Sequence, residues 1–248
     1  MIEKRRDEGM GRKFVQGLFH GLPIGLGYLS VSFAFGIYAL GYGLTVWETL
    51  LISMTNVTSA GQLAGVPILA SGGGIAELAL TQLVINLRYS LMSISLSQKL
   101  HRSVHTGDRM LIAFINTDEF FAVASSRPEP LRKSYLYGLG VFPYLGWALG
   151  TLAGALAGDL LPASVISAMG IMIYGMFVAI VFPAMKQSKA TALCVLVAVG
   201  LSVMFRYVPV LNQVSSGFAI ILCAVGASAL LAWLMPLPAG DEEKEACE

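Results

Sequence analysis

The chain has 248 residues, of which 56% are hydrophobic and only 12% are charged, whereas an ordinary soluble domain carries about 25% charged residues. Such a chain cannot hide its apolar surface in one water-facing globule, and its mean hydropathy of +0.71 indicates a polytopic membrane protein. The formal net charge of +1, with basic residues in small clusters, argues against a nucleic-acid partner and makes membrane lipid the expected surroundings.

Segments with few charges, each long enough to cross a bilayer at about 20 residues, fill most of the chain. A basic N-terminal segment, residues 1–16, comes first, and no small-residue cleavage site follows it, so we expect the first apolar run to be retained. Seven clear candidates lie at 17–40, 47–70, 75–97, 134–157, 162–185, 189–207 and 215–236. We therefore expect an all-α, polytopic membrane helix bundle with one transmembrane domain, 17–236, and an acidic C-terminal tail, 237–248.

An eighth apolar segment, residues 110–126, carries Thr-Asp-Glu at 117–119 in its centre. Cytoplasmic loops of membrane proteins collect Lys and Arg. With seven crossings and a cytoplasmic N-terminus, the basic clusters at 127–133 and 186–189 fall outside. An eighth crossing moves both clusters inside and leaves outside only Lys99, Arg102, Arg109 and Arg206.

We therefore favour eight crossings, with both termini cytoplasmic, and interpret residues 110–126 as a broken or re-entrant element within the bundle. A surface amphipathic helix with solvated acids is the alternative.

Small residues recur at helix-packing spacing in "LGWALGTLAGALAG", where Gly146, Gly150 and Gly154 are four apart. In lipid, small residues on one face let two helix backbones approach closely, so we expect a packing seam here. A helix with an early proline occurs in each half, at Pro23 and at Pro143. This faint echo indicates an internal repeat, which many transporters have.

The second candidate span is interrupted by "MTNVTSAGQLAG", which packs many donors and acceptors into a few positions. Unpaired polar groups cost several kcal/mol each in hydrocarbon, so these groups must face protein, water or a ligand. A helix loosened at the glycine would free backbone groups for a small zwitterion, with a half-helix N-terminus attracting its carboxylate. Hydrogen bonds between helices are the alternative role. The residues concerned are Thr55, Asn56, Thr58, Ser59, Gly61 and Gln62.

Charged residues deep in the apolar segments are functional candidates, because inserting each one costs about 2.5 to 3.5 kcal/mol. Arg88 lies at the centre of its segment, two residues after Asn86, and Asp118 and Glu119 lie in the eighth segment. Arg88 either extends its long side chain to the interface or pairs with Asp118 or Glu119. In the second case the other carboxylate is left to titrate and to carry a proton.

Enzymatic chemistry has no visible apparatus in this sequence. The three cysteines form no metal-binding pair, and His101 and His105, although four apart, lack a third ligand. Nucleophile elbows, phosphate-binding loops and zinc-protease motifs do not occur. We therefore expect no catalytic residue, no metal and no cofactor.

Four stretches in this order carry a family resemblance: "GLPIGLGYLSVSFAFG", "TNVTSAGQLAG", "INLRYSLMSISLSQKL" and "NTDEFFAVA". Together they resemble the AzlC family of branched-chain amino acid permeases, along nearly the whole chain. The third and fourth stretches match best, through Asn86, Leu87, Arg88, Ser95 and Leu96 and then Thr117, Asp118, Glu119 and Phe121. The second departs from the family pattern, because Gly61 and Gln62 are adjacent. This departure leaves the identity of the substrate's side chain undetermined.

The resemblance implies the large subunit of a two-component exporter of valine, leucine or isoleucine in the cell's inner membrane, with a small AzlD-like membrane partner. On this reading Thr55, Asn56, Ser59 and Gln62 line the substrate site and Asp118 or Glu119 carries the coupling proton. A non-transporting membrane scaffold, in which the same polar residues serve only helix packing, is the second hypothesis.

Overall fold

The computed structural model describes residues 2–158, 161, 162, 164, 175, 178, 181–183, 185, 186 and 188–235, with the backbone alone for residues 2–10. All of its regular elements are helices. The all-α prediction is confirmed, and four helices are long and apolar enough to cross a membrane. Most of the expected span 162–185 and the tail 237–248 lie outside the described residues.

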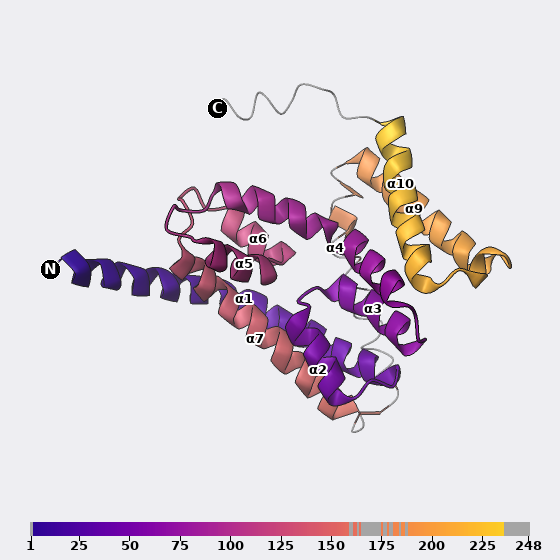
Figure 1. Cartoon of the computed structure of the whole chain (residues 1–248), viewed down its shortest axis with the longest axis horizontal. Helices are drawn as coiled ribbons and strands as arrows, with labels where there is room; N and C mark the ends of the chain where they lie inside the picture. The colour runs from indigo at the N-terminus through magenta and orange to yellow at the C-terminus, as the bar shows by residue number, and fades with distance from the viewer. Residues whose placement is uncertain are drawn as a thin grey trace.

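Helix α1 (Ile2–Gly41) and helix α7 (Lys133–Ala157) pack side by side in parallel and form the long axis of the molecule (Figure 1). Their backbones meet through glycines: a Cβ on Gly150 would lie 2.4 Å from the Leu29 carbonyl oxygen, and one on Gly154 would lie 2.0 Å from that of Phe33. Contacts this close leave no room for a side chain, so the predicted glycine seam on α7 is confirmed.

The expected second span is a broken hairpin of two shorter helices, α2 (Val46–Thr55) and α3 (Ser59–Ala70). Thr58 caps α3 by accepting a hydrogen bond from the Gly61 amide, 3.2 Å away. The break therefore lies before Gly61, which is inside α3, and this corrects the expectation that the glycine itself loosens the helix. Val66 of α3 packs against Ala39 at the end of α1, so α3 returns to the end of the molecule from which α2 starts.

Helix α4 (Ile75–Gln98) then runs back toward the N-terminal end, and a second broken hairpin follows, α5 (Thr106–Phe114) and α6 (Asp118–Ser125). The segments before α5 and after α6 pair with each other: the His101 amide donates to the Leu131 carbonyl at 2.9 Å and the Leu131 amide donates to the Lys99 carbonyl at 2.8 Å. At 1.5 Å per residue each helix is only about 12 to 14 Å long, so the hairpin enters and returns.

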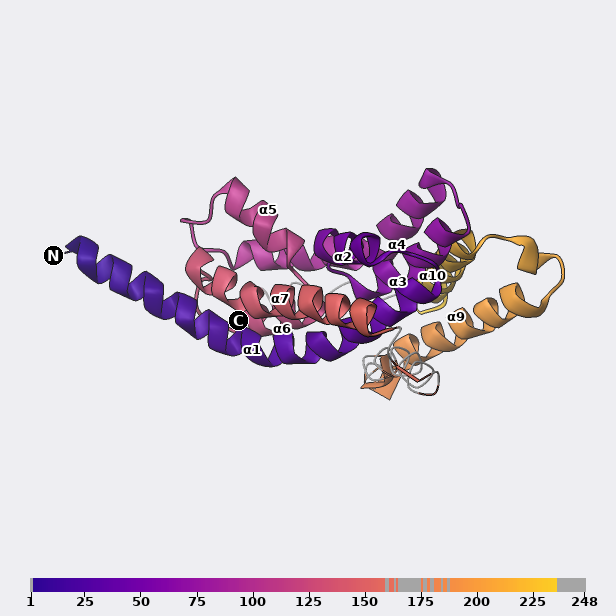
Figure 2. The same cartoon turned by 90° about the horizontal axis from the view of Figure 1, so that it is seen from below.

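This re-entry corrects the crossing favoured by the charge count. Residues 110–126 begin and end at the same end of the molecule, and Figure 2 shows α5 in the half of the molecule that holds the N-terminus. The broken or re-entrant character expected from the sequence is confirmed, whereas the count of eight crossings, which needed residues 110–126 to cross, is not.

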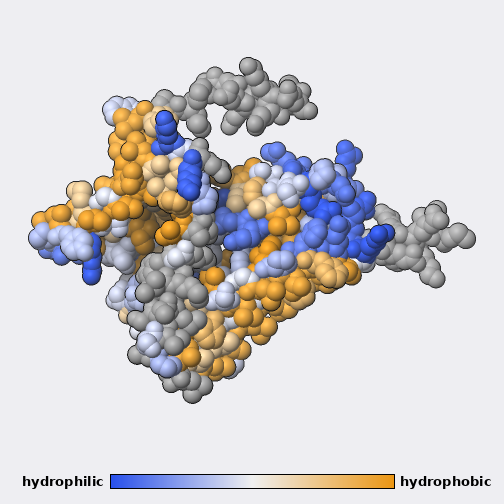
Figure 3. Space-filling view, turned by 180° about the vertical axis from the view of Figure 1, so that it is seen from behind, coloured by the Kyte–Doolittle hydropathy of each residue, from blue (hydrophilic) through white to orange (hydrophobic). Residues whose placement is uncertain are grey.

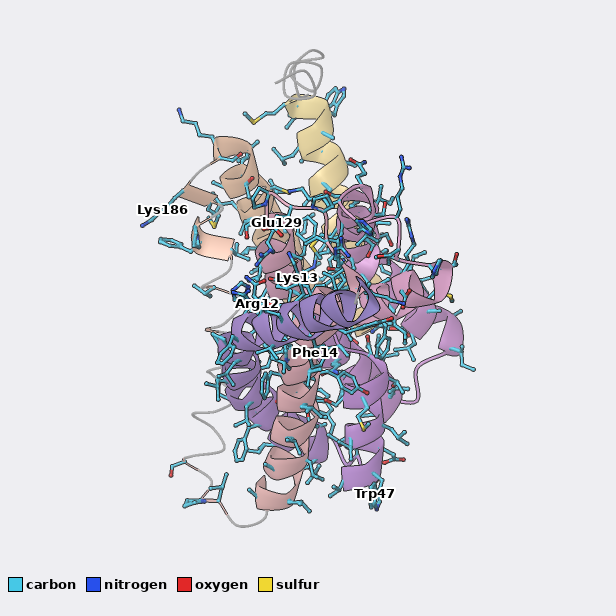
Figure 4. All side chains as sticks on the ribbon, turned by 90° about the vertical axis from the view of Figure 1, so that its left-hand side faces the viewer. Arg12, Lys13, Phe14, Trp47, Glu129 and Lys186 are labelled. Atoms are coloured by element: carbon cyan, nitrogen blue, oxygen red, sulfur yellow. The ribbon has the colours of Figure 1, made fainter. Side chains whose placement is uncertain are left out.

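Cations from three segments of the chain gather at this end of the molecule. Lys13 pairs with Glu129 at 2.6 Å, Lys133 with Asp108 at 3.4 Å, and Lys99 donates to the Ser125 carbonyl at 2.5 Å. Lys13 and Glu129 lie together in Figure 4, and hydrophilic side chains gather around this end in Figure 3. Lys99, expected on the opposite side, therefore lies with the N-terminal cations, which strengthens the charge asymmetry that the positive-inside rule uses.

The partners of the two carboxylates in these clusters lower the pKa of each. The Tyr137 hydroxyl and the His105 amide hold the pKa of Asp108 below its ordinary value. The hydrogen bond from Lys13 does the same for the pKa of Glu129. Both carboxylates therefore stay ionised at neutral pH.

Helix α9 (Lys189–Tyr207), a short 3-10 turn η2 (Leu211–Gln213) and helix α10 (Ser216–Leu234) form an apolar pair at the opposite end from the N-terminus (Figure 1). The Gly217 amide of α10 donates to the buried Glu77 carboxylate of α4 at 3.0 Å. Glu77 therefore satisfies an otherwise unpaired amide in the first turn of α10.

Candidate functional site

A cavity of ≈ 270 Å³ lies where the two broken hairpins meet in the interior. Helices α1, α4, α6 and α7 contribute to its walls, together with the connection between α2 and α3 and the start of α3. Its lining consists of Tyr28, Val57, Ser59, Ala60, Ile85, Arg88, Tyr89, Thr117, Asp118, Glu119, Trp147 and Val181.

The central contact in the cavity joins Arg88 of α4 to Asp118 in the first turn of α6. The guanidinium Nη2 and the carboxylate Oδ2 are 2.9 Å apart. Arg88 also donates to the Tyr89 hydroxyl at 3.1 Å and lies over the Tyr89 ring, 4.8 Å from its centre. The predicted pairing of Arg88 with one of the two acids is confirmed.

The second acid, Glu119, is held by a tyrosine and not by a cation. The Tyr28 hydroxyl of α1 is in hydrogen-bond contact with the Glu119 carboxylate and with the Thr117 hydroxyl, the latter at 2.7 Å. Tyr28 in turn meets the Trp147 ring edge to face, with ring centres 5.2 Å apart. Within the part of the chain that the structure describes, Glu119 forms no ion pair, so its environment differs from that of Asp118.

Both half-helices that begin at the cavity do so with a threonine cap. Thr58 precedes α3 and Thr117 precedes α6, and each side-chain oxygen accepts a hydrogen bond from an amide of its helix. The first amides of a helix have no partner within it, and they give the N-terminus a partial positive charge. Ser59 and Ala60, which line the cavity, contribute the first two such amides of α3.

Most of the polar residues predicted from the interrupted second span do not line the cavity but lie behind its lining. Gln82 of α4 is their hub: its amide nitrogen donates to the Gly61 carbonyl at 2.8 Å, and its oxygen accepts from Asn56 at 3.4 Å and from Asn86 at 3.1 Å. The Thr58 hydroxyl reaches the Asn86 oxygen at 2.9 Å. These bonds fix the break between α2 and α3 to α4.

Two further predicted residues bond within the same hairpin. Thr55 donates to the Leu51 carbonyl at 2.6 Å, and the buried Gln62 donates to the Asn56 carbonyl. Of the ten residues expected at the site, the cavity is therefore lined by Ser59, Arg88, Asp118 and Glu119, and the other six form its support.

Sequence reasoning missed four residues of this site: Tyr28, Gln82, Tyr89 and Trp147. Tyr28 and Trp147 stand in apolar runs, where they are indistinguishable from core or lipid-facing residues, whereas Tyr89 directly follows Arg88. A usable signal existed for Gln82, because it lies four residues before Asn86 and so shares its helix face.

The histidines do not form a metal site. His20 contacts the Tyr135 hydroxyl at 2.8 Å and His101 bonds Ser103 in its own loop at 2.8 Å. Among the described residues, no three His, Cys, Asp or Glu side chains come together as metal ligands would.

The fold and the site define a polytopic helical membrane protein with two broken hairpins that enclose a small charged cavity. The model of the AzlC protein family matches residues 23–161, which include both hairpins. The chain belongs to the AzlC family, and the resemblance found in the sequence is confirmed. This is a family of membrane transporters related to branched-chain amino acid transport.

Individual relatives agree with this membership. The inner membrane protein YgaZ of Escherichia coli is 28% identical over 193 residues, which are 75% of this chain and 78% of YgaZ. An uncharacterized membrane protein of Archaeoglobus fulgidus is 31% identical over 182 residues, 72% of this chain and 79% of that protein. No solved structure matches the chain.

Proposed function

We propose that the protein exports valine, leucine or isoleucine across the inner membrane, as the proton-coupled large subunit of a pair with a small AzlD-like membrane protein. The observation that carries the proposal is the cavity between two helix breaks, with one acid paired to Arg88 and the other held by Tyr28. Its ≈ 270 Å³ fall below the roughly 300–1,000 Å³ of pockets for drug-sized ligands, so the cavity suits a small solute.

The cavity offers a complementary group for each part of an amino acid. Asp118 and Glu119 attract the ammonium group, and the free amides at the start of α3 attract the carboxylate. Aliphatic side chains of Val57, Ala60 and Ile85 belong to the same lining and would contact a branched side chain. The hydrogen bonds of Gln82 support this role, because they hold the start of α3 in place.

Glu119 is the proton carrier in this proposal. Asp118 is joined to a permanent cation 2.9 Å away, and its protonation would break that ion pair. Glu119 has a neutral hydroxyl partner instead, so protonation breaks no ion pair.

The remaining parts of the proposal concern the chain ends. Residues 1–16 form a basic cytoplasmic segment, 17–236 the transport domain and 237–248 a cytoplasmic tail. The cations that gather with Lys13 and Lys133 at one end of the molecule support a cytoplasmic position for that end.

Exchange of labelled valine in proteoliposomes, with and without the co-expressed partner, tests the function. Arg88→Ala and Asp118→Asn should each reduce valine exchange more than tenfold while the protein still inserts, whereas the exposed loop cation variant Arg102→Ala should exchange normally. A scaffold predicts loss of insertion or partner binding in the first two variants before any loss of flux. Wild-type exchange in both of them would contradict the site.

A further inference from the structure

One buried donor in the cavity wall has no acceptor. Trp147 of α7 is 4% exposed and lines the cavity, and its indole Nε1 has no hydrogen-bond partner among the described residues. Five other buried polar atoms share this condition, but none of their residues lines the cavity; they belong to Thr49, Gln62, Thr81, Asn116 and Ser134.

The chemistry of this donor restricts what can satisfy it. An indole N–H only donates, and a buried tryptophan usually finds an acceptor for it. The edge-to-face contact with Tyr28 packs the ring at 5.2 Å and 77°, so the N–H cannot turn freely toward another group as a hydroxyl does. Because Trp147 lines the cavity, a molecule bound there can supply the missing acceptor.

An amino acid brings only one acceptor group, its carboxylate. Its ammonium group donates, and Asp118 and Glu119 in the same lining are acceptors for it. Asp118 already accepts from Arg88 at 2.9 Å, which leaves Arg88 engaged with an acid of the protein. A second donor for the substrate's carboxylate is therefore needed beside the amides of Ser59 and Ala60.

We propose that the indole N–H of Trp147 donates a hydrogen bond to the carboxylate of the amino acid bound in this cavity. The inference rests on the proposed transport function and assigns a binding role to a residue that the sequence motifs leave out. Trp147 and the start of α3 then hold the carboxylate, and Asp118 and Glu119 hold the ammonium.

The test removes the N–H from the protein and the carboxylate from the ligand. Trp147→Phe keeps an aromatic ring against Tyr28, and it should raise the KM for valine about tenfold. Trp47→Phe, the same change at an exposed tryptophan outside the cavity, should leave the KM unchanged. Isobutylamine, which is valine without its carboxylate, should inhibit valine exchange equally well in the wild type and in Trp147→Phe.

The outcomes separate this inference from the function on which it rests. An unchanged KM in Trp147→Phe, or an equal loss of affinity for valine and isobutylamine, would overturn the role of Trp147 and leave transport standing. Absence of saturable valine exchange in the wild type would overturn the proposed function, and this inference with it.

A second measurement does not depend on the folding of Trp147→Phe. The chain has three tryptophans, and replacing the exposed Trp47 and Trp233 by Phe leaves Trp147 as the sole emitter. Valine should shift its fluorescence saturably near the KM, while isobutylamine should not. Equal shifts with both ligands, or none with valine, would contradict the proposal.

Discussion

Arg88 in the middle of α4 and Asp118 at the start of α6 are joined by an ion pair of 2.9 Å. Helix α4 therefore holds the break between α5 and α6 in place. The same helix contacts the other break two residues earlier, where the Thr58 hydroxyl donates to the Asn86 side-chain oxygen at 2.9 Å. Each half-helix that opens on the cavity is thus held by α4.

The first prediction separates substrate binding from proton coupling. Glu119→Gln removes the titrating oxygen but keeps an acceptor for Tyr28, so we expect valine exchange to continue within about threefold of wild type. Net efflux driven by a pH gradient should fall more than tenfold and lose its pH dependence. Both modes are measured in the same proteoliposomes, and pH-driven efflux that survives in Glu119→Gln would remove this residue from the proton path.

A second prediction concerns the seam between α1 and α7. A Cβ at Gly21 would lie 2.3 Å from the Leu139 carbonyl oxygen, whereas one at Gly27, on the same helix, meets nothing within 4 Å. Gly21→Ala should therefore destabilise the protein by about 1 to 3 kcal/mol, and Gly27→Ala should be neutral or slightly stabilising, because Ala is the better helix former. Thermal unfolding in detergent measures both, and equal melting temperatures would contradict the close approach of the two helices.

The third prediction tests the re-entry of α5 and α6. In a cysteine-free background, cysteines at Ser103 and Ser126 should react with an impermeant maleimide from the same side of the membrane, because Leu100 and Leu131 pair with each other. A cysteine at Ser71, after α3, should react from the opposite side. Labelling of positions 103 and 126 from opposite sides would contradict re-entry and show that the segment between them crosses the membrane.

The fourth prediction is a pH dependence of stability at the basic end. Lys13 lowers the pKa of Glu129 in the folded protein, so the stabilisation is present above the ordinary pKa of 4.5 and is lost as the pH falls through the lower, folded value. Glu129→Gln should melt at a lower temperature than wild type at pH 7, with the difference vanishing near pH 3. High salt should also shrink the difference, since the pair is exposed; a difference independent of pH and salt would point to packing instead.

Local chemistry explains which parts of this architecture could be predicted. The length of the apolar segments predicted the long helices, and the high cost of burying charge predicted that Arg88 pairs with Asp118 or Glu119, of which the structure shows Asp118. The breaks were also readable, because Thr58 and Thr117 each stand where a cap is required. The prediction placed the break at Gly61, too far along the chain, although Thr58 before it was the better signal.

Long-range pairing explains what could not be predicted. The bridge between Leu100 and Leu131 decides whether residues 110–126 cross or re-enter. The local sequence around either leucine does not predict this bridge. Tyr28 and Trp147 come from two separate apolar helices and meet only because glycines bring α1 and α7 together. Their roles in the cavity follow from that packing, which a single sequence does not display.

Protection of Ser59 by substrate tests most directly whether the cavity between the two breaks is the transport site. In the cysteine-free background, Ser59→Cys lines the cavity, whereas Thr55→Cys, at the end of α2 on the other side of the break, does not. Saturating valine or leucine should slow maleimide labelling of the cysteine at position 59 at least fivefold and leave position 55 unaffected. Unchanged labelling at position 59, under conditions where the same protein exchanges valine, would place the substrate elsewhere and contradict the account.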